Sequence, residues 1–200
     1  MASPHIDIKP ENIMLDGDGH VRIIDLGLAR DDVTASSTIC GRAGTYRYMA
    51  PEILQDKAYS TAVDWWSLGI VVSRMAYGHS PFFDGHQMQQ VYKSITTDKP
   101  KFPTWLQVDL KHLIKKLLRK DPESRLSVTG KIRGHPFFGT ICWEDLEQRR
   151  VVPPFKPFPV NEEDKDDNWN EKSSPLLDSE SDSALSISSS VRRLLRAIAT

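Results

Sequence analysis

The chain has 200 residues with a formal net charge of −1, and 39% of its residues are apolar and 26% charged. This composition fits one compact domain followed by a tail, and the near-zero charge gives no reason to expect a nucleic-acid partner. Cys40 and Cys142 form no CxxC pair, which favours a reduced, cytoplasmic setting. We expect no membrane association, because the most apolar run, residues 68–72, is followed by Arg74 and is too short to span a bilayer.

The first residues place His5, Asp7, Lys9 and Asn12 in the pattern His-x-Asp-x-Lys-Pro-Glu-Asn. Phosphoryl transfer needs an acceptor for the hydroxyl proton, cations over the phosphates and oxygen ligands for a metal ion. Asp7 fits the first role, Lys9 can meet the transferring phosphate, and Asn12 can hold Mg²⁺ through its amide oxygen. A lone Asp-x-Lys or Asp-Leu-Gly is more often a surface turn.

A β-hairpin is predicted next, because two short apolar runs, residues 13–15 and 21–24, flank the turn sequence Asp16-Gly17-Asp18-Gly19. The aspartates could also suggest a calcium loop. Gly27 stands where the closing bidentate glutamate would be needed, so we favour the simple turn. Asp25 follows the second strand directly and can hold a bridging Mg²⁺ in the pocket of the first motif.

The remaining pattern is mostly helical. Residues 31–48 lack periodicity and predict a long loop. Residues 61–77 are apolar nearly all round, which indicates a helix buried at the centre of the domain. Residues 110–119 repeat apolar side chains at helical spacing with cations between them, which indicates an amphipathic surface helix ending near Asp121-Pro122.

The last forty residues differ in composition from the rest. Residues 161–182 hold nine acidic residues against two lysines, and residues 173–190 are rich in serine. They offer too little apolar surface to offset the entropy of ordering, so a disordered tail is predicted. Ser174, followed by proline, is a candidate phosphosite. The final ten residues could form a partner or membrane-surface helix, but at that length we favour a weakly helical end.

Three islands in this order resemble the catalytic loop, metal-binding loop and activation-segment end of protein kinases: residues 5–12, Asp25-Leu26-Gly27 and Ala50-Pro51-Glu52. The full set, with a hairpin between the first two, rarely arises by chance. Several later features resemble the AGC group of Ser/Thr kinases: Trp65-Trp66, His135-Pro136-Phe137-Phe138, Trp143 and Pro153-Pro154-Phe155-Lys156-Pro157. The run from Tyr48 to Pro157 is most similar to protein kinase C.

The resemblance implies a mainly α fold, namely a protein-kinase-like large lobe with a small β-hairpin at the catalytic loop and a disordered C-terminal tail. It implies a Ser/Thr protein kinase that uses ATP and Mg²⁺ to phosphorylate protein substrates on Ser or Thr, with basic residues nearby. Asp7 would be the base and Lys9 the phosphate contact, a lysine typical of Ser/Thr rather than Tyr kinases. Asn12 and Asp25 would be the metal ligands.

Five further positions match the family pattern. Gly44 and Thr45 would face the substrate, with Thr45 bonding to the catalytic base and its neighbouring lysine. Asp64 would hold the catalytic-loop backbone, and Arg125 would pair with Glu52. We interpret the last three as scaffold, since a buried ion pair needs both partners.

The resemblance divides the chain into a partial kinase domain (1–138), an AGC-type C-terminal segment (139–160) and the acidic, Ser-rich tail (161–200). No Gly-rich loop, strand lysine or helix glutamate precedes Asp7 in this sequence. Orientation supplies a large share of catalysis, so we expect a truncated kinase that is inactive by itself. The sequence makes no prediction about oligomeric state.

Two positions depart from the family pattern, and the activation loop is ambiguous. Ile6 replaces the arginine that normally pairs with an activation-loop phosphate, which puts control by loop phosphorylation in doubt. Leu26 is an apolar replacement for phenylalanine. Thr38 is the best candidate for the loop phosphosite, and Ser36 and Ser37 rank below it. Counting back from Ala50-Pro51-Glu52 instead places the family's phosphosite at Gly41. A loop that is not phosphorylated fits equally well.

Two alternatives to an enzyme stay open. The chain could be a non-catalytic, kinase-derived interaction module that binds kinase substrates or regulators, because the substrate-facing surface is present. It could also be a fragment that misfolds, since an uncovered interlobe surface would expose apolar patches that invite aggregation.

Overall fold

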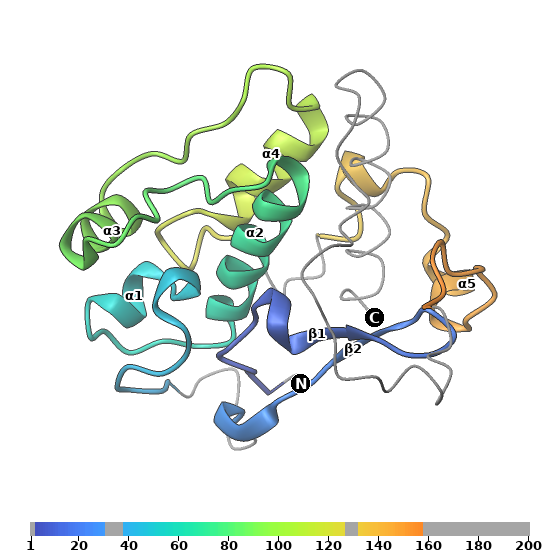
Figure 1. Cartoon of the computed structure of the whole chain (residues 1–200), viewed down its shortest axis with the longest axis horizontal. Coiled ribbons are helices and arrows are strands. Elements are labelled where there is room, and N and C mark those ends of the chain that lie inside the picture. Colours follow the sequence, from blue (N-terminus) through green and yellow to red (C-terminus); the bar gives the residue numbers. More distant parts are fainter. Residues whose placement is uncertain (1–2, 31–37, 127–131, 158–200) are drawn as a thin grey trace, which may run out of the picture.

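The computed structural model describes residues 3–30, 38–126 and 132–157. This part is mostly helical with one two-stranded antiparallel sheet, which confirms the predicted fold class of a kinase-like large lobe (Figure 1). The elements in chain order, with η for 3₁₀ helices, are η1 (Pro10–Asn12), β1 (Ile13–Leu15), β2 (Val21–Ile23), η2 (Leu26–Leu28), η3 (Tyr46–Tyr48), α1 (Pro51–Leu54), α2 (Ala62–Tyr77), α3 (Met88–Thr96), α4 (Val108–Leu117), η4 (Pro136–Phe138) and α5 (Trp143–Glu147). The predicted tail, with Ser174, lies outside the described residues.

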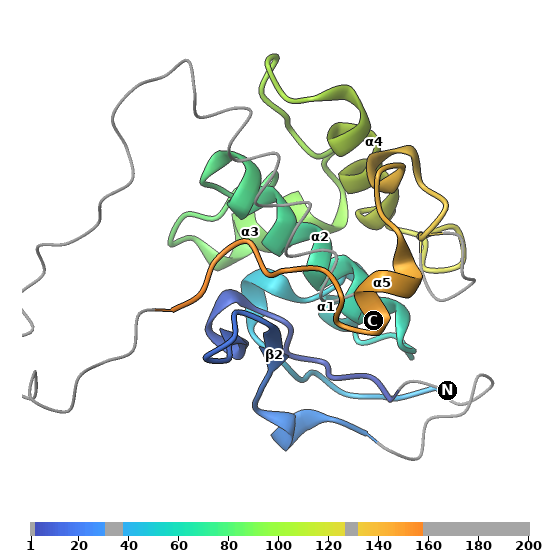
Figure 2. The same ribbon diagram turned by 90° about the vertical axis from the view of Figure 1, so that its right-hand side faces the viewer.

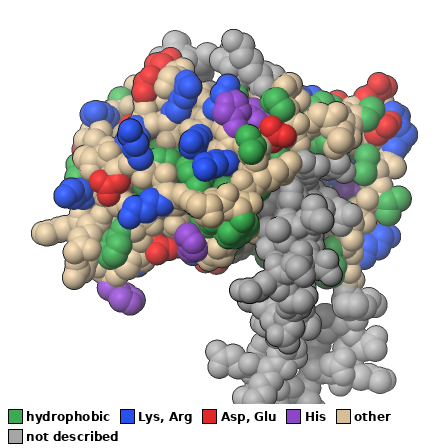
Figure 3. Space-filling model, turned by 90° about the horizontal axis from the view of Figure 1, so that it is seen from above, with side chains coloured by type: hydrophobic (Ala, Val, Ile, Leu, Met, Phe, Trp, Pro, Cys, Tyr) green, Lys and Arg blue, Asp and Glu red, His purple; other side chains and the backbone are tan. Residues whose placement is uncertain are grey.

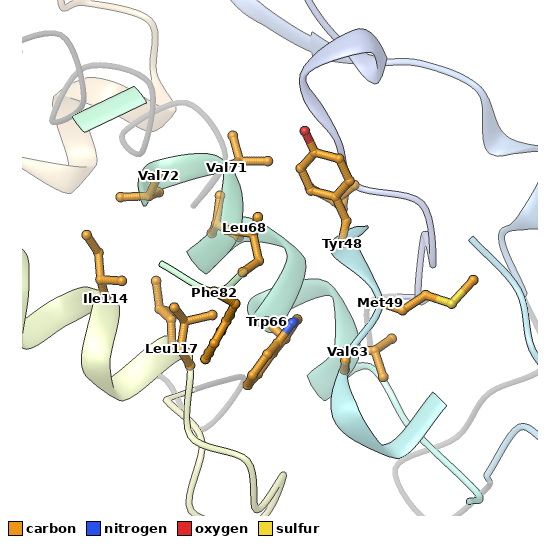
Figure 4. Close-up of a cluster of buried hydrophobic side chains, with 14 of the residues drawn as sticks. Tyr48, Met49, Val63, Trp66, Leu68, Val71, Val72, Phe82, Ile114 and Leu117 are labelled. Atoms are coloured by element: carbon orange, nitrogen blue, oxygen red, sulfur yellow. The ribbon is translucent and has the colours of Figure 1, made fainter. Parts of the chain in front are cut away.

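Helix α2 runs through the centre of the core, as its apolar sequence predicts, and ends at Gly78, whose φ of +83° suits a glycine. Its Trp66 is fully buried and stacks on Phe82 with the ring centroids 5.4 Å apart (Figure 4). The hydroxyl of Ser67 donates to the carbonyl oxygen of Tyr48 at 2.8 Å. The helix is therefore joined directly to the segment that ends the activation loop.

Helix α4 packs its apolar face against α2. The helix buries Leu110, Leu113, Ile114 and Leu117, the residues that helical spacing singles out. A Cβ atom at Gly69 of α2 would lie 2.8 Å from Leu118 Cδ2, so the missing side chain allows the close approach.

The end of α4 differs from the prediction. The helix stops at Leu117, four residues before Asp121, because Leu118 leaves helical geometry at φ −94° and ψ 29°. The carbonyl oxygens of Arg119 and Lys120 then accept hydrogen bonds from the Arg125 side chain instead of from later helical amides.

Strands β1 and β2 form the predicted hairpin, with Ile13 opposite Ile23 and Leu15 opposite Val21. Asp16 closes the turn, since its Oδ1 accepts from the backbone nitrogens of Asp18 and His20 at 3.2 and 2.8 Å. Asp16 thus stabilises the turn that the sequence predicts. Within the described residues, no group of three or more His, Cys, Asp or Glu side chains could hold a metal ion.

The last described segment lies against this hairpin. Trp143 of α5 packs edge-on to Phe138 at 5.5 Å, and the chain then passes the hairpin turn (Figures 1 and 2). Gly19, with φ +88°, contacts the carbonyl oxygen of Phe155, and no side chain would fit there. Among the described helices, none is both long and apolar enough to cross a membrane.

Candidate active site

The catalytic-loop backbone is held by a carboxylate from α2. Asp64 accepts hydrogen bonds from the backbone nitrogens of His5 at 2.7 Å and Ile6 at 2.8 Å. Ile6 is buried and has φ of +71°, a conformation that β-branched residues rarely adopt and that persists only where the surroundings fix it. Burial raises the pKa of Asp64 in spite of the two bonds that favour its charged form. Asp64 therefore stabilises a strained turn directly before Asp7.

His5 joins the same loop to the end of β2. The backbone nitrogen of Asp7 donates to His5 Nδ1 at 3.3 Å, so the ring proton lies on Nε2, which donates to the carbonyl oxygen of Ile24 at 2.9 Å. Ile24 directly precedes Asp25. One imidazole ring therefore positions the backbone of Asp25 relative to that of Asp7.

Asp7 lies at the centre of a cluster of hydrogen-bond donors. Its Oδ2 forms an ion pair with Lys9 Nζ at 2.7 Å and accepts from Asn12 Nδ2 at 3.3 Å, while its Oδ1 accepts from the backbone nitrogen of Thr45 at 2.8 Å. Lys9 also donates to Thr45 Oγ1 at 3.1 Å, and Asn12 to the Asp7 carbonyl oxygen at 2.9 Å. The structure thus brings together four residues that the sequence singled out.

This cluster favours the charged forms of both Asp7 and Lys9. Burial would raise the pKa of Asp7, but hydrogen bonds from Lys9 and Thr45, with the Lys9 charge, together lower that pKa below its usual value. The hydrogen bond to Asp7 likewise raises the pKa of Lys9. The Asp7 carboxylate is 6% exposed and ionised at neutral pH, so it can accept a hydroxyl proton. The ammonium beside it can meet negative charge on a transferring group.

Gly44 allows Thr45 to reach the catalytic loop. Its φ is +98°, and a Cβ atom there would lie 2.6 Å from the carbonyl oxygen of Ile6. Only glycine accommodates both this backbone conformation and this close approach. The two predicted substrate-facing residues, Gly44 and Thr45, therefore border the Asp7 carboxylate directly.

The predicted metal ligands lie on neighbouring strand ends. The backbone nitrogen of Ile24 donates to the carbonyl oxygen of Asn12 at 3.0 Å. The residue directly before Asp25 is therefore bonded to the backbone of Asn12. Asp25 has φ of +62° and is exposed, with Gly27 N at 3.4 Å from its carboxylate. The amide nitrogen of Asn12 is used by Asp7, which leaves its amide oxygen for a cation. Mg²⁺ keeps several waters and prefers oxygen ligands, so this pair fits it.

Glu52 of α1 and Arg125 form a buried, bidentate ion pair. The two nitrogen–oxygen distances are 2.7 and 2.9 Å, and the side chains are 5% and 0% exposed. Arg125 donates further to the carbonyl oxygens of Ala62, Arg119 and Lys120. The pair thus joins α1, the start of α2 and the chain after α4, which is the scaffold position the sequence suggested.

Two further contacts hold the activation loop, and the sequence analysis missed both. Ile39 and Tyr59 exchange backbone hydrogen bonds of 2.8 and 2.9 Å. Arg42 forms a bidentate pair with Asp56, with both distances at 2.8 Å, and donates to the carbonyl oxygen of Leu54 at 3.1 Å. These contacts fix residues 39–42 against the end of α1. No motif spacing indicates them, because the partners meet only in the folded chain.

Of the candidate phosphosites, only Thr38 lies among the residues that the structure describes. Thr38 is exposed, whereas Ser36, Ser37 and Ser174 lie outside the described residues. Ile6, which stands where the resemblance implies an arginine, is buried at 4% exposure and offers no cation to a loop phosphate.

Comparisons with known proteins agree with the geometry. The family model of the protein kinase domain matches residues 3–138. Protein kinase C delta type from Mus musculus is 46% identical over 151 residues, which cover 76% of this chain and 22% of that protein, and the Homo sapiens protein is 43% identical over the same span. RAC-beta serine/threonine-protein kinase B from Xenopus laevis is 41% identical over 162 residues, covering 79% of this chain. This chain matches only 33% of that relative's length.

Proposed function

Because the chain belongs to the protein kinase family and resembles its AGC group, we propose that it carries the phosphoryl-transfer site of a Ser/Thr protein kinase. The reaction is transfer of the ATP γ-phosphoryl group to a Ser or Thr hydroxyl of a protein with basic residues nearby. The observation that carries the proposal is the Asp7 carboxylate bonded to Lys9, Asn12 and Thr45 at once.

Each residue has a defined task in this reaction. Asp7 accepts the proton of the attacking hydroxyl, and Lys9 lies 2.7 Å from it, where it can stabilise charge on the transferring group. Thr45 holds both side chains in place from the substrate side. Asn12 and Asp25 would hold Mg²⁺, which neutralises phosphate charge when it is bound.

We further propose that the 200 residues do not hold ATP firmly by themselves. They contain no Gly-rich phosphate loop or strand lysine before Asp7. Large apolar side chains of the hairpin and of the residues just after it are exposed, namely Met14, Leu15, Ile23, Ile24, Leu26 and Leu28. Such a surface suits contact with a further protein body that would complete the nucleotide site.

The same exposed side chains favour the second candidate, a non-catalytic interaction module. In that case the hairpin face and the substrate-facing residues bind kinase substrates or regulators without phosphorylating them. A cytoplasmic location stays a prediction under both functions, and it rests on two cysteines that are unpaired and exposed.

The test is a chimera in which residues 3–157 replace the matching part of mouse protein kinase C delta type, so that the relative supplies what precedes it. We expect transfer of labelled phosphate from ATP to a basic Ser peptide, abolished by Asp7→Asn and by Asp25→Asn. A folded chimera without transfer would refute the enzyme proposal and leave the interaction module. The chain by itself should transfer nothing, and Asp25-dependent transfer by it would show that it holds ATP unaided.

A further inference from the structure

Four lysines lie in or beside the segment that carries Phe102, two of them over its ring and two just before it in the sequence. Lys99 and Lys101 lie in the loop after α3, and Lys111 and Lys115 belong to α4. The ammonium groups of Lys111 and Lys115 are 5.9 and 5.8 Å from the centre of the Phe102 ring. We call these four lysines the lysine surface. Figure 3 shows one face of the molecule on which Lys and Arg side chains gather around an apolar area, with fewer acidic groups between them.

The lysine surface differs from three half-exposed arginines of the protein. Arg22, Arg42 and Arg150 are about half exposed, and each pairs with an aspartate at 3.1 Å or less. Within the described part of the chain, none of the four lysines forms an ion pair with a carboxylate. Unpaired like charges held close together raise the local potential and attract an anionic partner. Trp105, in the loop between Phe102 and α4, is also exposed and offers an apolar ring to a partner.

The chain itself contains a segment of matching chemistry. Residues 161–182 hold nine acidic residues and two lysines, a net charge of −7. Trp169 stands among them, and an aromatic ring binds lysine ammonium groups favourably. This acidic segment begins four residues after the last described residue, Pro157.

The acidic segment is also long enough. Its 22 residues can extend over roughly 70 Å, at about 3.3 Å per residue. A folded domain of about 150 residues has a radius of gyration of only about 15 Å. The segment can therefore reach α4 from the hairpin end of the molecule without disturbing the fold.

We propose that residues 161–182 bind the lysine surface of the same chain. Each exposed charge pair contributes little, so the contact depends on many pairs together and weakens as salt screens them. The bound acidic segment shields the lysines from other polyanions. Phosphorylation of serines in or beside it would add negative charge and strengthen the contact.

Zero-length carbodiimide coupling of lysines to carboxylates, mapped by mass spectrometry on the full chain, tests this directly. We expect coupling between the lysine surface and residues 161–182, lost at high salt. An equal mixture of ¹⁴N- and ¹⁵N-labelled chains assigns the partner, because coupling within one chain never joins the two labels. If the products that join differently labelled chains were as abundant as those within one label, the same-chain assignment would be overturned in favour of a second copy. Coupling spread evenly over all lysines, including exposed Lys57 after α1, would overturn the proposal as well.

Binding to heparin, used as a polyanion probe, gives a second test. Neutralising the nine acids of residues 161–182 to Asn and Gln should tighten heparin binding about tenfold, because the lysine surface is released. Changing all four lysines to Gln in this acid-neutralised chain should remove the gain in heparin binding, whereas Lys57→Gln in the same chain should keep it. Circular dichroism checks that each variant is folded. If neutralising the acids left heparin binding unchanged, or if the gain survived in the four-lysine variant, the lysine surface would not be the site of the acidic segment.

Discussion

Removal of either partner of the buried Glu52–Arg125 pair should be far more costly than removal of an exposed pair with the same geometry. Glu52→Gln leaves the guanidinium buried opposite a neutral amide, and breaking a buried ion pair in this way costs about 3–5 kcal/mol of unfolding free energy. Arg125→Met also deprives the carbonyl oxygens of Ala62, Arg119 and Lys120 of donors. At about 1 kcal/mol for each lost hydrogen bond, this variant should be the less stable of the two.

The chain provides its own matched control in Arg42 and Asp56. This pair is also bidentate, at 2.8 Å for both contacts, but its side chains are 52% and 63% exposed. Solvent screening limits such a pair to about 0–1 kcal/mol. Asp56→Asn is the suitable variant, because Asp56 has φ of +55° and asparagine tolerates that conformation.

Urea unfolding at neutral pH, followed by tryptophan fluorescence, measures both effects on one scale. A domain of this kind has a total stability of about 5–15 kcal/mol, so Glu52→Gln should lower the midpoint by a large fraction and Arg125→Met could abolish folding. Asp56→Asn should leave the midpoint nearly unchanged. Equal losses for Glu52→Gln and Asp56→Asn would refute the argument that burial sets the value of the ion pair.

Three further predictions concern single positions. Gly44→Ala should reduce phosphoryl transfer by the chimera about 100-fold, because its Cβ would displace the Ile6 carbonyl and with it the loop that carries the base; an active variant would contradict this. Burial raises the pKa of Asp64, so its contribution to stability is full below the unfolded pKa and falls as pH rises through the folded value. The stability of the parent chain relative to Asp64→Asn should therefore increase as pH falls from about 7 to about 4, and a constant difference in urea midpoints would count against the shift. Gly19→Ala should separate the Phe155 segment from the hairpin turn, giving faster trypsin cleavage after α5 but an unchanged urea midpoint, and equal cleavage rates would oppose it.

Local pattern was enough to predict the main elements. The buried helix α2 and the amphipathic helix α4 appear as apolar spacing, and the hairpin appears as two short runs around a turn. The end of α4 could not be predicted from the position of the proline: the helix ends at Leu117, and the carbonyl oxygens of Arg119 and Lys120 accept hydrogen bonds from Arg125, a partner that only the folded chain brings there. Proline marked a limit to the helix, and the helix ends four residues before Asp121.

The candidate site was predicted in part for the same reason. Motif order singled out Asp7, Lys9 and Asn12, and the structure brings them together. The sequence did not indicate that Ile6 adopts φ of +71°, since isoleucine favours extended backbone, and only the Asp64 carboxylate explains how that conformation is held. The pairing of Arg42 with Asp56 depends on how the loop folds back onto α1, which no local pattern encodes.

The unequal anchoring of the two halves of the site has a consequence for amide hydrogen exchange. Asp7 follows backbone that is bonded to α2, the helix at the centre of the core, and such backbone exchanges mainly through global unfolding. Asp25 follows a hairpin of three residue pairs in which Met14, Leu15 and Ile23 are exposed, and segments of this kind open locally at much lower free energy. Cation coordination at Asp25 would therefore be coupled to closure of a separate cooperative unit, while the proton-accepting carboxylate belongs to the unit that opens last.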